Sequence, residues 1–519
     1  MTPTAAAPAP PRRPSPKPAA ARTTRNGLVR RTTLVRRLTK ARGASLAVIV
    51  APPGYGKSSL LGEWSEHDDR EFVWLTPDVL EDDDLEAQVG ALLAGADASH
   101  GVVLVLDDAH RAPAEVVRCG LERLLEEIPA GSMVAVSSRT EPPLPLGRLR
   151  ACRALIEVRV QDLAMMPAEA SILLRHAGLE LDFASVQALV TRTEGWPAGL
   201  YLAALSLGAE PDVTGALGRL RGDEHRLAEY FRDEILSALP PDLTEFAVRT
   251  SVLEELSGPV CDAVLDRPGS ALMLSGLAQA SPLLRPLDPA HERFRWHGLF
   301  RDALGAELRR TAPEDVRPLH DRASAWFEEH GDPDHAIAHA VYAHDSVRAG
   351  DLLCAGIVAY ITQGRNELVQ DWLAGFSREE LARHAPLALA GAHSFLAAGN
   401  AAEARHLAVA AAAAVDRRPA AGVRSLSAGL AVIDAALGRH DVGTMGEVAG
   451  RACKREPEDS PWRPISLFLR GTSLHLTGDS VAAVQVLDEG ADLGETTAPA
   501  VTSVCLAQAA MIAIEQRDW

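Results

Sequence analysis

The chain has 519 residues, too many for a single hydrophobic core, so its length indicates several domains. Its 47% hydrophobic and 24% charged residues are ordinary values for a globular protein. The net charge of −18 is unevenly spread, because residues 1–42 hold 11 Lys or Arg and no acid, leaving 41 bases against 70 acids elsewhere. This balance argues against a broad nucleic-acid-binding surface on the body of the chain.

The N-terminal residues 1–25 are rich in Ala, Pro and Arg and are expected to be a disordered, solvated tail. They lack the apolar centre of a signal peptide, and no apolar run approaches the length of a membrane span. The six cysteines are scattered without a CxxC pair, which is typical of reduced, small apolar residues. We therefore expect a cytoplasmic protein that does not contact the membrane.

Residues 26–160 are predicted to form an α/β P-loop nucleotide-binding domain. Short, β-branched apolar runs alternate with helical patterns such as 115–127, and this alternation indicates a parallel sheet covered on both faces. The runs predicted as buried strands are 46–50, 72–75, 102–106, 133–136 and 156–160.

Two further domains are expected between the sheet and the C-terminal half. Residues 161–225 are predicted to be all-helical, with Pro197 at the first position of a new helix. Residues 226–312 are predicted to be a winged-helix domain, because helices at 230–239 and 243–253 precede a short hairpin of strands 283–287 and 293–296.

Residues 313–519 are predicted to form a TPR-like α-solenoid of helix pairs, and the alternative is a set of unrelated helical hairpins. The prediction depends on glycines that recur every 33 to 40 residues where helices would end, at Gly331, Gly364, Gly399, Gly438 and Gly478. The chain stops midway through such a unit, so we expect the repeats to be incomplete at the C-terminus.

The chemistry is concentrated in a phosphate-binding loop between a buried strand and a helix. The run Ala51-Pro-Pro-Gly-Tyr-Gly-Lys-Ser58 supplies glycines for close backbone approach and a helix N-terminus for anions, although Ala replaces the usual first Gly. Lys57 is expected to reach the β- and γ-phosphates of ATP, and Ser58 to bind Mg²⁺. The predicted nucleotide contacts of the loop are Pro53, Gly54, Tyr55, Gly56, Lys57, Ser58 and Ser59.

Two acids follow the strand at 102–106, at the sheet edge where open α/β folds bind ligands. Asp107 is expected to hold Mg²⁺ through water, the alternative being a helix cap, and Asp108 is the candidate catalytic base. Arg139 follows the strand at 133–136, where it could sense the γ-phosphate. An ordinary surface arginine is the alternative, and position alone does not separate the two.

Together these motifs resemble the MalT-like branch of large LuxR-type regulators, in the STAND class of signal-transducing P-loop NTPases. The resemblance covers roughly residues 26–345, and the helical repeats follow it more loosely. The matching stretches are AxxGYGKS at 51–58, LVLDDAH at 104–110, SSRTEPPLPLGRLRA at 137–151, EGWPAGLYLAALSL at 194–207, LAEYFRDEIL at 227–236, TSVLEELSG at 250–258 and RWHGLFRDAL at 295–304.

The resemblance adds four residues to the expected site. It implies that Pro197 lies against the adenine, that Val29 and Arg31 lie near the base and ribose, and that His297 lies near the β-phosphate of ADP. Taken alone, the histidine in Arg-Trp-His-Gly-Leu is more typical of a satisfied core or surface residue.

The resemblance also implies a switch that is closed with ADP and open with ATP, with slow hydrolysis as its reset. An inducer would bind the helical repeats, the ATP form would self-associate, and DNA would be bound only by a C-terminal domain that residues 346–519 do not resemble. The alternatives are a STAND scaffold that signals by self-association without a DNA-binding effector, and a metabolic ATPase or kinase, for which no second substrate site is visible.

Overall fold

The computed structural model of the chain describes residues 29–75 and 101–517, apart from short gaps at 130, 209, 211, 282, 418–422, 438–440, 457–459 and 461. The expected N-terminal tail and Gly438 lie outside the described residues. The chain divides into two compact units, Met1–Pro313 and Glu314–Trp519. No helix among the described residues is both long and apolar enough to cross a membrane.

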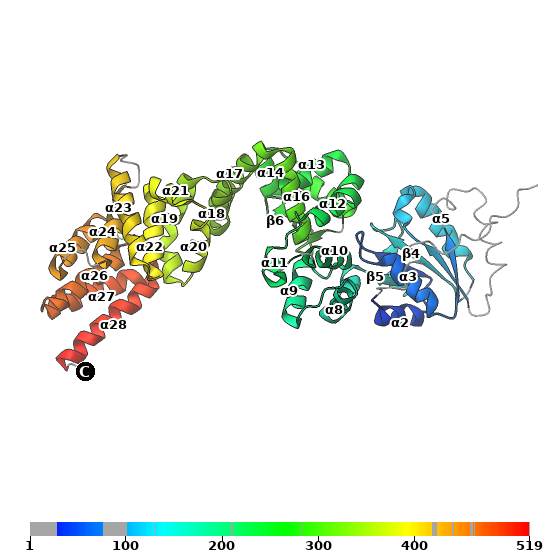
Figure 1. Cartoon of the computed structure of the whole chain (residues 1–519), viewed down its shortest axis with the longest axis horizontal. Coiled ribbons are helices and arrows are strands. Elements are labelled where there is room, and N and C mark those ends of the chain that lie inside the picture. Colours follow the sequence, from blue (N-terminus) through cyan, green and yellow to red (C-terminus); the bar gives the residue numbers. More distant parts are fainter. Residues whose placement is uncertain are drawn as a thin grey trace, which may run out of the picture. The chain divides into compact units, whose positions relative to one another are not determined.

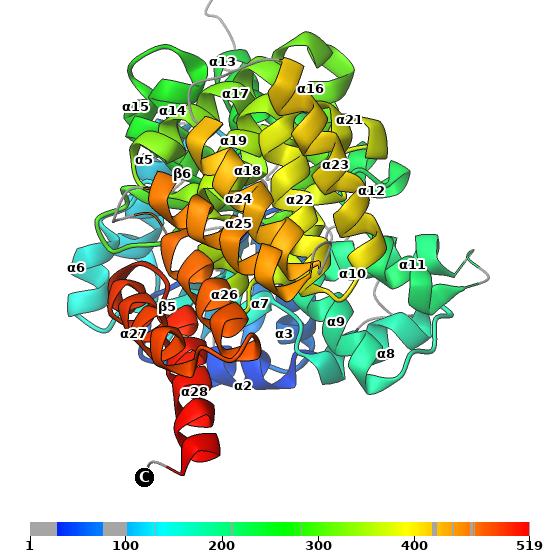
Figure 2. The same ribbon diagram turned by 90° about the vertical axis from the view of Figure 1, so that its left-hand side faces the viewer.

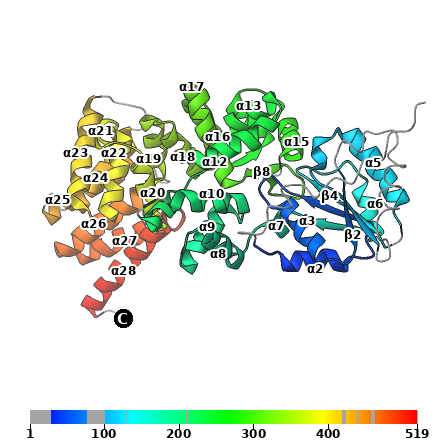
Figure 3. The same ribbon diagram turned by 45° about the vertical axis from the view of Figure 1, so that its right-hand side comes forward.

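The first unit begins with a five-stranded parallel sheet of order β2-β3-β4-β1-β5. Its elements are α2 (Thr32–Lys40), β1 (Leu46–Val50), α3 (Lys57–Glu66), β2 (Glu71–Leu75), β3 (Val102–Leu106), η3 (Ala109–Arg111), α5 (Ala114–Glu127), β4 (Met133–Ser138), α6 (Leu146–Ala151) and β5 (Leu155–Val158). Alternate residues of β1, beginning with Leu46, pack with apolar side chains of α5 and α6. Helices α2 and α3 cover the other face (Figures 1 and 3). The expectation of a parallel sheet covered on both faces is confirmed.

One strand end differs from its prediction. The strand expected at 156–160 ends at Val158, and Val160 begins the short helix α7 (Val160–Leu163). The Asp162 carboxylate accepts a hydrogen bond from the Arg159 backbone N–H at 2.8 Å, which caps the new helix. Hydrophobic periodicity does not reveal this cap, so the predicted strand extends two residues beyond the observed one.

A helical region and a winged-helix domain complete the first unit. Their elements are α8 (Pro167–His176), α9 (Phe183–Thr193), α10 (Pro197–Leu207), α11 (Val213–Arg219), α12 (His225–Glu234), η4 (Leu236–Ala238), α13 (Pro241–Thr250), β6 (Glu255–Ser257), α14 (Gly258–Leu265), α15 (Ser270–Ala280), β7 (Leu284–Pro286), β8 (Arg293–Trp296) and α16 (Gly298–Thr311). Pro197 occupies the first turn of α10, as predicted.

The predicted winged-helix hairpin is present as β7 and β8, but the bounds of two helices need correction and a third strand was not predicted. The helix expected at 230–239 spans His225–Glu234, and a 3-10 turn follows at Leu236–Ala238. Pro240 disfavours a helical conformation for Leu239, which is extended, so the helical run does not reach the predicted end. The helix expected at 243–253 spans Pro241–Thr250. The hairpin is part of a three-stranded antiparallel sheet of order β6-β8-β7, and the three residues of β6 are too few for a readable alternation.

The second unit is helical throughout its described residues. Its helices are α17 (Pro313–Glu329), α18 (Pro333–Tyr342), α19 (Ser346–Thr362), α20 (Asn366–Leu373), α21 (Arg378–Arg383), α22 (Ala385–Ala397), α23 (Ala401–Arg417), α24 (Val423–Ala436), α25 (Val442–Arg455), α26 (Trp462–Leu476), α27 (Ser480–Thr497) and α28 (Pro499–Gln516). Successive helices from α22 to α28 pack side by side (Figure 2).

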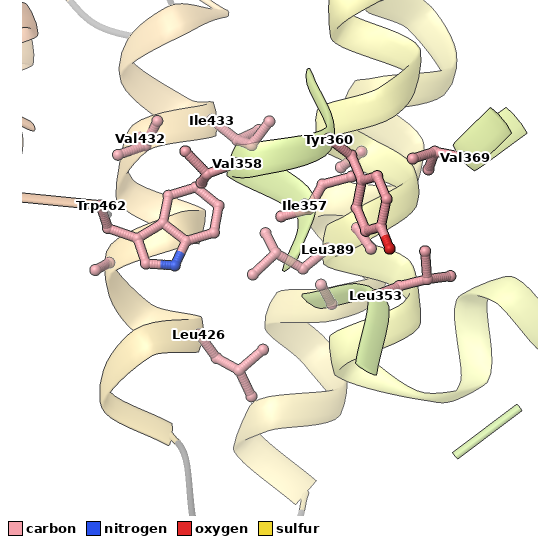
Figure 4. Close-up of a cluster of buried hydrophobic side chains, with 14 of the residues drawn as sticks. Leu353, Ile357, Val358, Tyr360, Val369, Leu389, Leu426, Val432, Ile433 and Trp462 are labelled. Carbon is pink, nitrogen blue, oxygen red and sulfur yellow. The ribbon is translucent and has the colours of Figure 1, made fainter. Parts of the chain in front are cut away.

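The recurring glycines end helices in this unit. Gly331, Gly364, Gly399 and Gly478 all have φ between 74° and 96°, the left-handed conformation that stops a helix and is cheap only for glycine. A continuous apolar core runs between the helices, in which Leu389 of α22 lies between the Tyr360 and Trp462 sides of the cluster (Figure 4). The predicted stacking of helices is confirmed, and its assignment to TPR repeats stays a prediction.

A buried aromatic side chain packs in the joint between the helical region and the winged helix. Phe231 of α12 is fully buried between Trp196 and Phe300, with ring centroids 5.1 and 5.2 Å away. We expect Phe231→Ala to lower the free energy of unfolding by about 3–5 kcal/mol, because a large cavity is left in a dry core. Phe183→Ala is the control, since that ring is 71% exposed and should change stability by less than about 0.5 kcal/mol. Urea unfolding of both variants decides, and equal losses would contradict the assignment.

Candidate nucleotide-binding site

The P-loop is held in a conformation that only its glycines permit cheaply. Gly54 and Gly56 have φ of 77° and 79°, and Gly56 directly precedes the first residue of α3, Lys57. The Lys57 ammonium is buried and donates to the carbonyls of Ala51 at 2.9 Å and Pro52 at 3.1 Å. Burial lowers the pKa of Lys57 to about 8. Smaller effects come from Asp108 and Asp107, which raise this pKa, and from Arg139, which lowers it. The sheet therefore brings this cation and the acidic pair into one cluster.

The strand order explains how the acidic pair meets the loop. Strand β4 lies between β1 and β3, so its C-terminal end separates the P-loop from the acids. There the Ser137 hydroxyl donates a hydrogen bond to the Asp107 carboxylate and accepts one from the Asp108 backbone N–H at 3.1 Å. Asp108 has a left-handed backbone with φ of 57°. Ser137 thus fixes both acids, a role that the sequence did not reveal because it depends on the order of the strands.

Arg139 is paired with the winged-helix domain. Its guanidinium donates to the backbone carbonyl and to the carboxylate of Glu234, each at 2.9 Å. Glu234 is the last residue of α12. The arginine therefore acts electrostatically on Lys57 and is bonded to α12, and its role as a phosphate sensor stays a prediction.

An apolar cavity of about 330 Å³ adjoins the P-loop and α3. Its volume falls within the range of about 300–1,000 Å³ that is common for small-molecule sites. Three residues expected near a base or ribose, Val29, Arg31 and Pro197, line it together with the P-loop. The remaining lining residues are Gly54, Tyr55, Gly56, Ser59, Leu60, Glu63, Leu163, Met165, Leu173 and Ala198.

Arg31 fixes the wall of this cavity. Its guanidinium donates to the Glu169 carboxylate at 2.6 Å and to the Asp162 carbonyl at 2.9 Å, and its backbone N–H donates to the Glu63 carboxylate at 2.8 Å. The residue therefore ties the entry of the nucleotide fold to α3, α7 and α8, and its side chain serves as a structural clamp.

The start of α10 lies directly against the P-loop. The Trp196 indole N–H donates to the Pro53 carbonyl and the Ala198 backbone N–H donates to the Gly54 carbonyl, both at 3.1 Å. A β carbon added to Gly54 would lie 2.4 Å from the Ala198 β carbon and 2.9 Å from the Tyr230 hydroxyl. The loop is thus covered by the helical region and by α12.

His297 lies behind this contact and does not line the cavity. It is 1% exposed, and its Nε2 donates to the Thr193 carbonyl at 2.9 Å. Its Nδ1 is buried without a hydrogen-bond partner, and burial lowers the pKa of the imidazole. In the neutral ring Nδ1 is an acceptor, so a phosphate contact requires a second proton on the ring.

The site contains several residues that the sequence did not single out. Glu63 had a readable signal, because it follows Gly56 and Ser59 at helical spacing on α3 and so shares their face. Leu163, Met165 and Leu173 are apolar residues like any others in the sequence, and only the tertiary fold brings them to the cavity. Ser58 is half-buried at the start of α3, close to the loop as expected.

Comparisons with known proteins agree with these features. The MalT winged helix domain family matches residues 232–316. The chain is 34% identical over 346 residues to the serine/threonine-protein kinase PknK of Mycobacterium tuberculosis, covering 59% of this chain and 31% of the relative. It is 28% identical over 257 residues to the HTH-type transcriptional regulator MalT of Vibrio campbellii, covering 48% of this chain and 28% of the relative. The chain thus spans about a third of the length of these relatives.

Among solved structures, a STAND protein with a tetratricopeptide repeat sensor from Pyrococcus horikoshii aligns over 95% of this chain and 81% of its own. The sequence identity is 14% and the TM-score is 0.37, which is too low to establish a shared overall arrangement.

The contact between the P-loop and α10 gives a matched pair of variants. Gly54→Ala and Gly56→Ala both place a β carbon on a left-handed backbone, at a cost of about 1–2 kcal/mol each. Only Gly54→Ala also collides with Ala198, since nothing lies within 4 Å of the new carbon at position 56. We expect Gly54→Ala to be less stable than Gly56→Ala by about 1–3 kcal/mol in urea unfolding. Equal stabilities would show that the loop and α10 are not in contact.

Proposed function

We propose that this chain, whose P-loop, winged-helix match and similarity to MalT indicate a MalT-like P-loop protein of the STAND class, is a nucleotide switch in transcriptional regulation. In this proposal ADP holds the first unit closed, ATP opens it, and the helical repeats sense a small-molecule or protein inducer. The open form self-associates. Slow hydrolysis of ATP resets the switch.

The observation that carries the proposal is the buried Lys57 ammonium beside the apolar cavity. Among the described residues the ammonium donates its hydrogen bonds to two loop carbonyls, which carry no net charge, and burial lowers its pKa to about 8. A polyphosphate would supply the counter-charge that these carbonyls lack, while the adjoining cavity would take the base between Val29 and Pro197. A loop built for phosphate and an apolar pocket for a planar ring together favour a nucleotide over a simple anion.

The residues around Lys57 fit a magnesium nucleotide. Ser58 and Asp107 would hold Mg²⁺, which would neutralise phosphate charge. Asp108 would orient or deprotonate the attacking water. These are hard oxygen donors at the C-terminal edge of a parallel sheet, the chemistry that Mg²⁺ prefers.

Arg139 offers a physical basis for distinguishing ATP from ADP. Its partner in this structure is Glu234, and a γ-phosphate would compete with that carboxylate for the same guanidinium. ATP would then release α12 from the nucleotide domain, whereas ADP would leave the pair intact. His297, which the resemblance places near the β-phosphate of ADP, does not line the cavity in this structure, so a contact with ADP would require the winged helix to shift toward the P-loop.

The alternative output is a STAND scaffold that signals by self-association without a DNA-binding effector. The chain is similar to part of a protein named a transcriptional regulator and to part of a protein named a protein kinase, so a domain pair like this one is compatible with more than one output. Nucleotide-dependent promoter binding by the complete gene product would support the first output, and nucleotide-dependent assembly without DNA binding would support the second.

Lys57→Ala tests nucleotide binding directly. We expect the variant to lose retention of ATP and ADP, with affinity for a fluorescent ADP analogue falling at least about 100-fold, because the buried phosphate loses its charged donor. Lys40→Ala is the control, since it removes an exposed lysine at the end of α2. Unchanged nucleotide content in purified Lys57→Ala would exclude the P-loop assignment.

The depressed pKa of Lys57 predicts a pH dependence of nucleotide affinity. A phosphate stabilises the charged ammonium, so binding takes up a proton once the pH exceeds the value of about 8 in the free protein. ADP affinity should therefore be constant below pH 8 and fall about tenfold per unit above it, until the pKa of the complex is reached. Lys57→Arg should bind without this dependence because guanidinium stays charged. Measuring the ADP affinity of both proteins between pH 7 and 9.5 tests this prediction. A wild-type affinity that does not change with pH would argue against the depressed pKa of Lys57.

A further inference from the structure

Residues 193–198, here called the bracket segment, connect α9 to α10 and contact two other parts of the first unit. On one side they bind the P-loop, through the Trp196 indole and the Ala198 backbone N–H already described. On the other side they bind the winged helix, beginning with the bond from His297 to the Thr193 carbonyl. The P-loop and the winged helix are thus joined through six residues.

Glu194 makes most of the contact on the winged-helix side. Its carboxylate pairs with Arg285 of β7 and, at 3.4 Å, with Arg295 of β8. It also accepts from the backbone N–H of Gly298 at 3.4 Å, at the start of α16. The side chain is 16% exposed, so these charge-assisted bonds are only partly screened by solvent. The Glu194 carboxylate therefore contacts both strands of the hairpin and the start of the following helix.

The backbone of Glu194 supports a specific role for this contact. It ends α9 in the left-handed conformation with φ of 50°, which is unfavourable for a side chain of this size. Such a conformation persists when the surroundings fix it, and here the next residue, Gly195, is packed against the Met165 backbone. The turn that presents Trp196 to the P-loop is thus held by its backbone, and the carboxylate of the same turn links it to the winged helix.

Tyr55 of the P-loop is buried near this ion pair. It lies between the two phosphate-loop glycines, and its hydroxyl has no hydrogen-bond partner among the described residues. Burial raises the pKa of Tyr55 to about 12, with smaller opposing effects of Arg285 and Glu194. The direct contact between the P-loop and the bracket segment is therefore the one made by Trp196 and Ala198.

We propose that Glu194 is a positioning residue that couples nucleotide binding in the P-loop to docking of the winged-helix hairpin. The inference rests on the proposed nucleotide switch and names the contact through which the bound state is transmitted. Because coupling between two sites is reciprocal, loss of the Glu194 pairs must weaken ADP binding and also remove the response of the hairpin to ADP.

Hydrogen exchange with and without ADP measures both effects. In the wild-type chain, ADP should slow exchange in residues 52–58 of the P-loop and in residues 284–296 of the hairpin. In Glu194→Gln the P-loop should still be protected at saturating ADP while protection of the hairpin is lost, and ADP affinity should fall at least about fivefold. Arg285→Gln removes the same ion pair from the hairpin side and should show the same two effects. The double variant should lose no more ADP affinity than either single variant, because both substitutions break one pair.

Glu255→Gln is the matched control. It removes a carboxylate–arginine pair with Arg293 that lies within the winged-helix sheet and is about half exposed on both sides. This variant should keep the ADP response of the hairpin. A hairpin response retained in both Glu194→Gln and Arg285→Gln would overturn the inference, as would a wild-type hairpin that ignores ADP while the P-loop is protected. A wild-type chain whose P-loop shows no ADP protection would instead refute the proposed nucleotide switch.

Discussion

The approach of the P-loop to the start of α10 is the contact on which the first unit depends. At position 54 a β carbon would lie 2.4 Å from the Ala198 side chain, so the loop can rest against the helix only because glycine has none. This contact makes Pro197 and Ala198 part of the cavity wall, together with the loop and α3. The cavity is therefore shared between two domains, and whatever fills it acts on both.

The ion pairs around this contact differ in strength, and the difference fits their proposed roles. Arg139 and Glu234 are 28% and 45% exposed, so solvent screening leaves the pair about 0–1 kcal/mol. A γ-phosphate would displace so weak a partner at little cost. The Glu194 carboxylate is more enclosed and accepts hydrogen bonds from three groups on the winged helix. Its ion pairs are therefore harder to break, which suits them to transmitting movement between the P-loop and the hairpin. The weaker pair is the one proposed to respond to nucleotide.

The sequence predicted the parts of the site that are local in the chain. The P-loop and the Asp107–Asp108 pair carry their signal within a few residues, because a helical element follows a strand and a turn there. Pro197 carries a local signal only for the start of a helix, and the resemblance supplied its place in the site. The placement of β4 between β1 and β3, which brings Ser137 to both acids, depends on tertiary pairing. The partner of Arg139 lies 95 residues away, and no local pattern identifies it. The three residues of β6 were missed for the opposite reason, since they are too few to show a period.

The candidate base also favours switching over rapid turnover. The backbone of Asp108 is fixed, because its N–H donates to Ser137 and to Asp107. Its carboxylate is 40% exposed and lies 3.9 Å from His110, whose pKa burial lowers to about 4, so the neighbouring ring is neutral and orients the acid weakly. Efficient general-base catalysis needs the base to be held within a narrow range of positions. In the proposed switch a slow reset leaves the ATP form enough time to act, and an acid fixed at its backbone with an exposed carboxylate fits that role.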